Sequence, residues 1–168
     1  AQLPAGATLQ LNGALNNVSL ATALKLDALG INADGTHAIV VTDSATNFLK
    51  VTDPASLPAG ATLQLSNATN SVSAANAVKL AALGVSATPG HAIVVSDSAT
   101  NIVNNITSLA QLPAGATLQL NSALNNVNLA TALKLDALGI NADGTHAIVV
   151  PDSVTNFLKV TDPASLPA

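Results

Sequence analysis

The chain has 168 residues, enough for one domain with a buried core, and a formal net charge of −4. Charged residues make up only 8% of it, and its five lysines are scattered, which argues against a nucleic-acid partner because such binding needs a basic patch. No apolar run approaches the ~20 residues of a membrane-spanning helix, so no membrane insertion is expected. The absence of cysteine excludes disulfides and thiolate metal sites. The first residues lack the basic and apolar regions of a signal peptide.

Two phrases recur along the chain and define a tandem repeat. Leu-Pro-Ala-Gly-Ala-Thr-Leu-Gln-Leu occupies Leu3–Leu11, Leu57–Leu65 and Leu112–Leu120, and its first letters return at Leu166–Ala168. His-Ala-Ile-Val-Val begins at His37, His91 and His146, so the spacings are 54 and 55 residues. We predict a single array over residues 1–168, with copies at 1–56, 57–109 and 110–165 and the start of a further copy at 166–168.

The first half of copy one predicts a strand, a turn and a helix. Ala7–Leu11 alternates apolar and polar residues, as a half-buried strand does. The Asn-rich stretch Asn12–Asn17 then predicts a polar turn. Ser19 is a suitable N-cap for a helix over Leu20–Leu29, and Gly30 stands where a helix-ending glycine belongs. The helix residues expected to face the core are Leu24, Leu26 and Leu29.

The second half predicts a strand between two turns. An Asp-Gly turn at 34–35 precedes the apolar strand Ala38–Val41. Asp43 or Ser44 is expected to cap a short helical segment. Asp53 followed by proline is typical of a second N-cap.

Superposition of Leu9–Leu11 on Ile39–Val41 indicates a half-repeat, and therefore two coils in each copy of 54–55 residues. Strands that alternate with helical returns imply parallel pairing and right-handed crossovers. The predicted fold class is α/β: a right-handed repeat solenoid, with one parallel sheet of six strands on one side and short helices and turns on the other. Its outward sheet positions are expected to be Gln10, Val40, Gln64, Val94, Gln119 and Val149.

No residue pattern predicts catalysis, a cofactor or a metal site. The three histidines would lie two strand spacings apart, about 9–10 Å, too far to share one zinc ion at ~2.0–2.1 Å. A calcium loop is not predicted at Asn32–Asp34, because the closing Glu of such loops is missing. The aspartates of the recurring Asp-Ser-Ala/Val-Thr-Asn phrase are ideal caps, and its asparagines are expected to form a ladder inside the coil. These aspartates are Asp43, Asp97 and Asp152, and these asparagines are Asn47, Asn101 and Asn156. An enzyme is not expected.

The phrase Val95-Ser-Asp-Ser-Ala-Thr-Asn-Ile102 resembles modules that are tandemly repeated in giant secreted bacterial surface proteins of the RTX-adhesin kind. Residues Ser71–Gly84 look like the partner phrase of the same modules. The resemblance covers all three copies and implies a non-enzymatic array at the bacterial cell surface or outside the cell. The Gly-rich calcium nonapeptides of such proteins are missing here, so calcium-driven folding is not implied.

The sequence favours a structural role: an extracellular fibre, sheath or adhesin stalk that stacks head to tail with itself. The expected assembly edges are Ala7, Thr8, Leu9, Gln10 and Leu11 at one end, and Ala147, Ile148, Val149 and Val150 at the other. The alternative is a ligand-binding module that uses the outward sheet face for a protein, a glycan or ice. That face lacks aromatic and charged anchors, and the threonines that ice binding would use recur only in every second coil.

Overall fold

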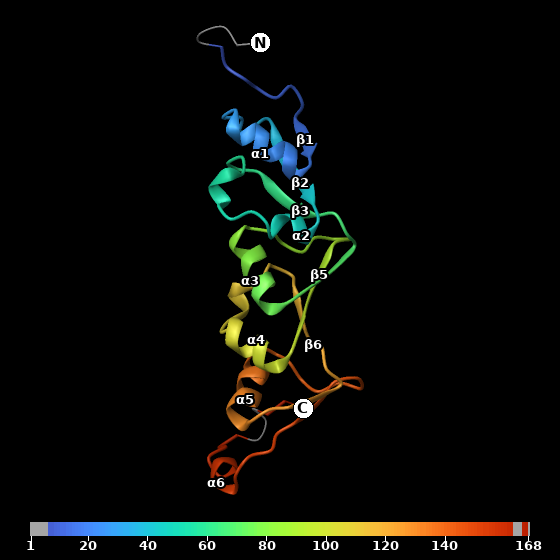
Figure 1. Cartoon of the computed structure of the whole chain (residues 1–168), viewed down its shortest axis with the longest axis vertical. Coiled ribbons are helices and arrows are strands. Elements are labelled where there is room, and N and C mark those ends of the chain that lie inside the picture. Colours follow the sequence, from blue (N-terminus) through green and yellow to red (C-terminus); the bar gives the residue numbers. More distant parts are fainter. Residues whose placement is uncertain (1–6, 163–165, 168) are drawn as a thin grey trace.

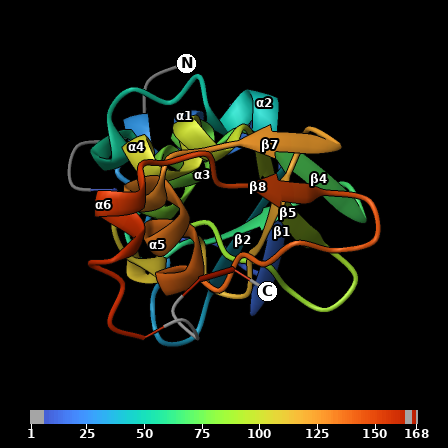
Figure 2. The ribbon, with the colours of Figure 1, turned by 90° about the horizontal axis from the view of Figure 1, so that it is seen from below.

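The computed structural model describes residues 7–162 and 166–167. The molecule is elongated, and the chain passes along its long axis in sequence order, from α1 near one end to α6 at the other (Figure 1). Helices α1, α3, α4, α5 and α6 line one side of this axis and the strands line the other, whereas the short α2 lies on the strand side, as the end-on view in Figure 2 also shows. The mixed α/β class with parallel strands is therefore confirmed.

Copies two and three each contain three strands and two α-helices, and copy one contains two strands and two α-helices among its described residues. The strands are β1 (Leu15–Val18), β2 (Ala38–Asp43), β3 (Thr62–Leu65), β4 (Thr69–Val72), β5 (Ala92–Asp97), β6 (Thr117–Leu120), β7 (Leu124–Asn126) and β8 (Ala147–Val149). The helices are α1 (Leu20–Ala28), α2 (Ala45–Phe48), α3 (Ala74–Ala82), α4 (Ala99–Asn105), α5 (Leu129–Ala137) and α6 (Val154–Phe157), with short 3₁₀ turns η1 (Pro54–Ser56) and η2 (Leu109–Gln111). None of the described helices is long and apolar enough to cross a membrane.

The strands form three separate parallel sheets, in the orders β1-β2-β3, β4-β5-β6 and β7-β8. The prediction of one six-stranded sheet is therefore wrong. Short breaks at residues 66–68 and 121–123 separate β3 from β4 and β6 from β7. In copy two, β3 thus completes the first sheet and β4 begins the second. In copy three, β6 completes the second sheet and β7 begins the third.

The second strand segment was predicted as a polar turn, and that prediction is wrong. Its central asparagine is buried or half-buried and donates to two backbone carbonyls. In β4, Asn70 Nδ2 donates to Asn67 O at 2.9 Å and to Ala92 O on β5 at 3.1 Å. Asn16 and Asn125 repeat both bonds in the other copies. A residue type typical of turns is tolerated here because its polar groups are satisfied within the sheet.

The predicted strand Ala38–Val41 is confirmed as part of β2, in which Ile39 and Val41 are buried and Val40 between them is half-buried. The expected row of outward residues is not. Val40 pairs with Thr62, whereas Gln64 pairs two positions further on with Thr42. The outward residues Gln10, Val40, Gln64, Val94, Gln119 and Val149 therefore do not align across the strands, because the half-repeat superposition used the wrong strand segment.

The capping predictions are confirmed. Ser19 caps α1 by accepting a bond from Thr22 N, and Gly30 follows the helix at φ +71°. Ser44 caps α2, and Asp53 caps η1 through Ala55 N. The predicted core face of α1 is wrong in part: Leu20 and Ala23 are buried, and the expected core residues Leu24 and Leu29 are exposed.

One contiguous core runs between the helices and the strands through all three copies. Its largest fully buried side chains include Phe48, Ile39, Leu65, Leu80, Ile93, Ile102 and Leu135. Side chains from successive copies share this core. The copies are therefore not independent domains, and each contributes part of its neighbour's packing.

The predicted first strand, Ala7–Leu11, is not a strand in copy one. The same phrase forms β3 and β6 in the later copies, where it pairs with β2 and β5 of the preceding copy. Within residues 7–162, no strand precedes Thr8–Leu11 that could provide such a partner. The predicted corner at 3–6 and the proline turn at 163 lie outside the described residues.

Candidate interface between repeat copies

The recurring aspartate joins the two halves of each copy. Asp43 Oδ2 accepts a bond from Leu20 N at the start of α1, at 3.1 Å. Its Oδ1 accepts bonds from Ser44 N at 2.8 Å and Asn47 Nδ2 at 2.7 Å. Asp97 and Asp152 repeat all three bonds in copies two and three. One carboxylate therefore fixes a helix N-terminus to the turn that follows the long strand.

The hydrogen bonds make these carboxylates hard to protonate. At Asp97, burial opposes ionisation, but the bonds from Asn101, Ala74 and Ser98 outweigh it and hold the pKa of the carboxyl below its usual range. The pKa of Asp43 and that of Asp152 are lowered by the equivalent bonds. Both oxygens of each carboxylate are engaged by structural donors. The recurring Asp-Ser phrase is thus accounted for by architecture.

The asparagines of this phrase do not form a ladder, and that prediction is wrong. Asn47 turns its amide to Asp43 within the same copy and accepts a bond from Lys50 Nζ at 3.0 Å. Asn156 and Lys159 repeat the arrangement in copy three. These bonds connect residues three and four apart in sequence, so they stabilise one short turn and do not connect coils.

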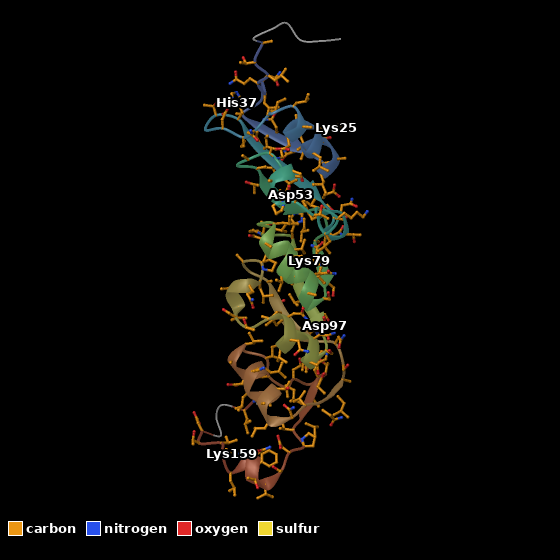
Figure 3. The ribbon with its side chains drawn as sticks, turned by 60° about the vertical axis from the view of Figure 1, so that its left-hand side comes forward. Lys25, His37, Asp53, Lys79, Asp97 and Lys159 are labelled. Carbon is orange, nitrogen blue, oxygen red and sulfur yellow. The ribbon has the colours of Figure 1, made fainter. Side chains whose placement is uncertain are left out.

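The histidines lie in loops and do not converge. His37 Nδ1 lies 3.0 Å from Asp34 Oδ1, and His146 contacts Asp143 in the same way. His91, whose copy has no aspartate there, lies 3.3 Å from Asn67 O. Figure 3 shows His37, Asp97 and Lys159 at different levels along the molecule. In the described part of the chain, no three His or Asp side chains are grouped so that they could hold a metal ion.

In the part of the chain that the structure describes, a joint with three parts recurs at both boundaries between copies. The first part is strand pairing. The second half of β2 pairs with β3, and Ser66 N donates to Asp43 O at 2.9 Å just past the end of the ladder. The second half of β5 pairs with β6 in the same register, and Asn121 N donates to Asp97 O at 3.0 Å.

The second part of the joint is the Pro-Ala-Gly corner. Ala33 N donates to Ala59 O at 3.0 Å, and Ala87 N donates to Ala114 O at 2.9 Å across the next boundary. Gly60 follows at φ +74°, where a Cβ would lie 3.4 Å from Ala33 Cβ. Glycine is favoured here because it adopts this backbone conformation without strain and lets the two segments approach.

The third part is a helix face that the sequence analysis missed. Leu49 and Val51 of copy one line one hollow together with Lys79, Ala82 and Leu83 of copy two. At the next boundary, Val103 and Ile106 share a hollow with Lys134, Ala137 and Leu138. The sequence did contain a signal, because the pattern Lys-x-x-Ala-Leu ends the long helix in every copy. Helical periodicity alone, however, does not show which element packs against these three residues.

Identical sequences at the two ends show what the joint contributes. Residues 20–31 and 129–140 are the same, yet Leu29 is 60% exposed while its equivalent Leu138 is 7% exposed. Residues 46–53 and 155–162 are also the same, yet Phe48 is fully buried while Phe157 is 40% exposed. In each pair, the buried member has a neighbouring copy against it.

The internal joints also sharpen the predicted assembly edges. The residues of β2 that pair with the next copy are Val40–Asp43, which correspond to 149–152 in copy three. Ala147 and Ile148 correspond to Ala38 and Ile39, which pair with β1 only. The predicted assembly edge at 147–150 thus shares residues 149 and 150 with the equivalents of this internal pairing segment, and its role in assembly stays a prediction. The opposite edge, Thr8–Leu11, corresponds to the whole of β3.

No family model matches the chain, and neither a curated protein nor a solved structure is similar to it.

Proposed function

We propose that the chain is a structural segment, a solenoid of stacked coils that extends a fibre, sheath or adhesin stalk at the cell surface or outside the cell. The observation that carries this proposal is the joint itself, which is built twice from the same three parts at the boundaries after copies one and two. A unit that reuses one joint adds length without a change of architecture. The extracellular location rests on the resemblance to secreted surface modules.

The recurring polar residues support a structural role. Asp43, Asp97 and Asp152 each accept three bonds from a cap, a turn or a helix start. The asparagines of the second strand segment bond to backbone carbonyls of the next strand. The residues that recur most strictly are thus used to hold the repeat together.

The alternative, a ligand-binding sheet face, has less support. Its outward residues are divided among three small sheets, apart from Gln10, which lies in no strand, and they do not align in one row. Val40 and Val94 are half-buried in their sheets and offer little surface to a partner.

The test is whether the length grows with copy number. A variant that carries a duplicate of residues 57–165, inserted after residue 165, is compared with the original chain by small-angle X-ray scattering. We expect a longer maximum dimension and an unchanged radius of gyration of the cross-section. A matched control carries a Gly/Ser insertion of equal length, which adds a flexible coil instead. An inserted chain that becomes wider without becoming longer would overturn the proposal.

A further inference from the structure

Described residues near the two ends repeat the sequences that form the two sides of the joint between copies. The end at α1 presents Lys25, Ala28 and Leu29, the same triplet that faces the preceding copy from α3 and α5. The end at α6 presents Leu158 and Val160, the equivalents of the residues that α3 meets.

Both halves are exposed and apolar. Leu29 is 60% exposed and Leu158 is 80% exposed, whereas their equivalents at the internal boundaries are buried or half-buried. Phe157 and Val154 add exposed apolar surface at the α6 end, and Leu9 adds exposed apolar surface at the α1 end. At the internal boundaries the equivalents of Phe157, Phe48 and Ile102, are fully buried, and the equivalents of Leu29 are buried at Leu138 and half-buried at Leu83.

We propose that a second copy of this chain adds to the α6 end in a fixed register, with its Thr8–Leu11 pairing in parallel with residues 149–152. This inference rests on the proposed structural function. The internal boundary between β2 and β3 gives the register: Val150 lies opposite Leu9 and Asp152 lies opposite Leu11, as Val41 lies opposite Leu63 and Asp43 opposite Leu65. In the added copy, residues 8–11 become a strand because residues 149–152 of the first copy pair with them.

Pro151 is the one difference between copies one and three inside this edge, where copy one has Thr42. Ala147 N donates to Ala123 O and Val149 O accepts from Val127 N, so these two residues turn their backbone groups toward β7. Alternate residues of a strand bond to the same side, which places the nitrogen of Pro151 on the β7 side as well. Its missing N–H therefore weakens the pairing inside copy three, consistent with the end of β8 at Val149.

The opposite side of this edge stays competent for pairing. Val150 and Asp152 alternate with Pro151 and turn their backbone groups away from β7, as Asp43 does when its carbonyl accepts the bond from Ser66 N. Proline is thus tolerated at the one position of the edge that a second copy does not use.

Disulfide capture tests the register, because the natural chain has no cysteine. In the double variant Leu9→Cys/Val150→Cys, one cysteine lies in the segment before β1 and the other in the segment after β8, and these segments lie far apart along the long axis of one molecule (Figure 1). In the proposed joint they lie on neighbouring strands about 4.8 Å apart, within the Cα separation that a disulfide spans. We expect mild oxidation to give a ladder of covalent dimers, trimers and longer species. The matched control, Thr8→Cys/Val150→Cys, is out of register by one residue and directs the two thiols to opposite faces, so we expect at least tenfold less cross-linking.

A second measurement does not depend on cysteine. Sedimentation velocity of the natural chain should show a mass that rises above 16.5 kDa with concentration, and Leu158→Asp should hold it at 16.5 kDa. Leu158 is exposed in the single chain, so circular dichroism should show an unchanged fold in this variant. A natural chain that stays monomeric at every concentration, or equal cross-linking in both cysteine pairs, would overturn the inference. An elongated monomer would still support the structural function, whereas a failure of the copy-insertion test would contradict that function itself.

Discussion

Helices α1 and α5 have the same sequence and the same local hydrogen bonds, and they differ in burial. Leu29 N and Leu138 N each donate to a lysine carbonyl at 3.2 Å, and both helices end in a glycine at φ above +70°. The side chain of Leu138 packs against the preceding copy, whereas that of Leu29 is exposed to solvent. Local sequence therefore determines the helix, and the neighbouring copy determines how much of it is buried. The following predictions test this difference with matched substitutions.

The largest difference is expected at the paired phenylalanines. Phe48→Ala removes a fully buried ring and should lower the free energy of unfolding by about 3–5 kcal/mol. Phe157→Ala changes the same sequence at the exposed end and should cost about 1 kcal/mol or less. Urea unfolding of both variants at low protein concentration measures the difference. Equal losses would show that the burial of Phe48 does not come from the next copy.

For the paired leucines, too, the substitution at the buried member should cost more unfolding free energy than the substitution at the exposed member. Leu138→Ala leaves a cavity against copy two and should cost about 2–4 kcal/mol, whereas Leu29→Ala should stay within about 1 kcal/mol. Thermal unfolding followed by circular dichroism is sufficient to rank them. A larger loss for Leu29 than for Leu138 would contradict the proposed role of the helix face.

The carboxylate bonds should matter most where they are buried. Asp97→Ala removes an acceptor that is 8% exposed and leaves Ala74 N, Ser98 N and the Asn101 amide without it, at an expected cost of about 1.5–3 kcal/mol. Asp152→Ala removes the same three bonds at a more exposed site and should cost less. Equal shifts of the chemical-denaturation midpoints of Asp97→Ala and Asp152→Ala would contradict the expected effect of burial.

Stability should also fall in acid. The folded-state pKa values of Asp43, Asp97 and Asp152 lie below the ordinary value of 3.8, so their contribution is present above that pH and is lost as the pH falls through the folded values. Unfolding free energies measured from pH 6 down to pH 2 should decline mainly below about pH 4. The variant Asp97→Asn should flatten this decline, and an unchanged slope would exclude a contribution from Asp97.

The sequence predicted the features that depend on a few neighbouring residues. Ser19, Ser44 and Asp53 cap their helices as expected, Gly30 follows α1, and Ile39 and Val41 face inward. Each of these follows from the chemistry of one turn or one strand. The repeat period followed from identity between copies and needed no structural assumption.

The sequence did not predict features that depend on distant partners. β1, β4 and β7 were missed because asparagine and serine usually mark turns, and only the carbonyls of the adjacent strand satisfy Asn16, Asn70 and Asn125. The division into three sheets was missed because the local sequence at 66–68 and 121–123 does not show that one strand ends there and a strand of another sheet begins. The exposure of Leu29 and Phe157 was missed because a repeat pattern does not show which copy has a neighbour packed against it.

Hydrogen exchange of the two identical helices within one molecule tests most directly whether a neighbouring copy provides the burial. Peptides 19–29 and 128–138 differ in mass because Ser19 is replaced by Asn128, so mass spectrometry separates them. At concentrations where the chain is monomeric, we predict that the amides of the last turn of α5 exchange at least tenfold more slowly than those of α1. Equal exchange in the two helices would contradict the account, because their own hydrogen bonds are the same.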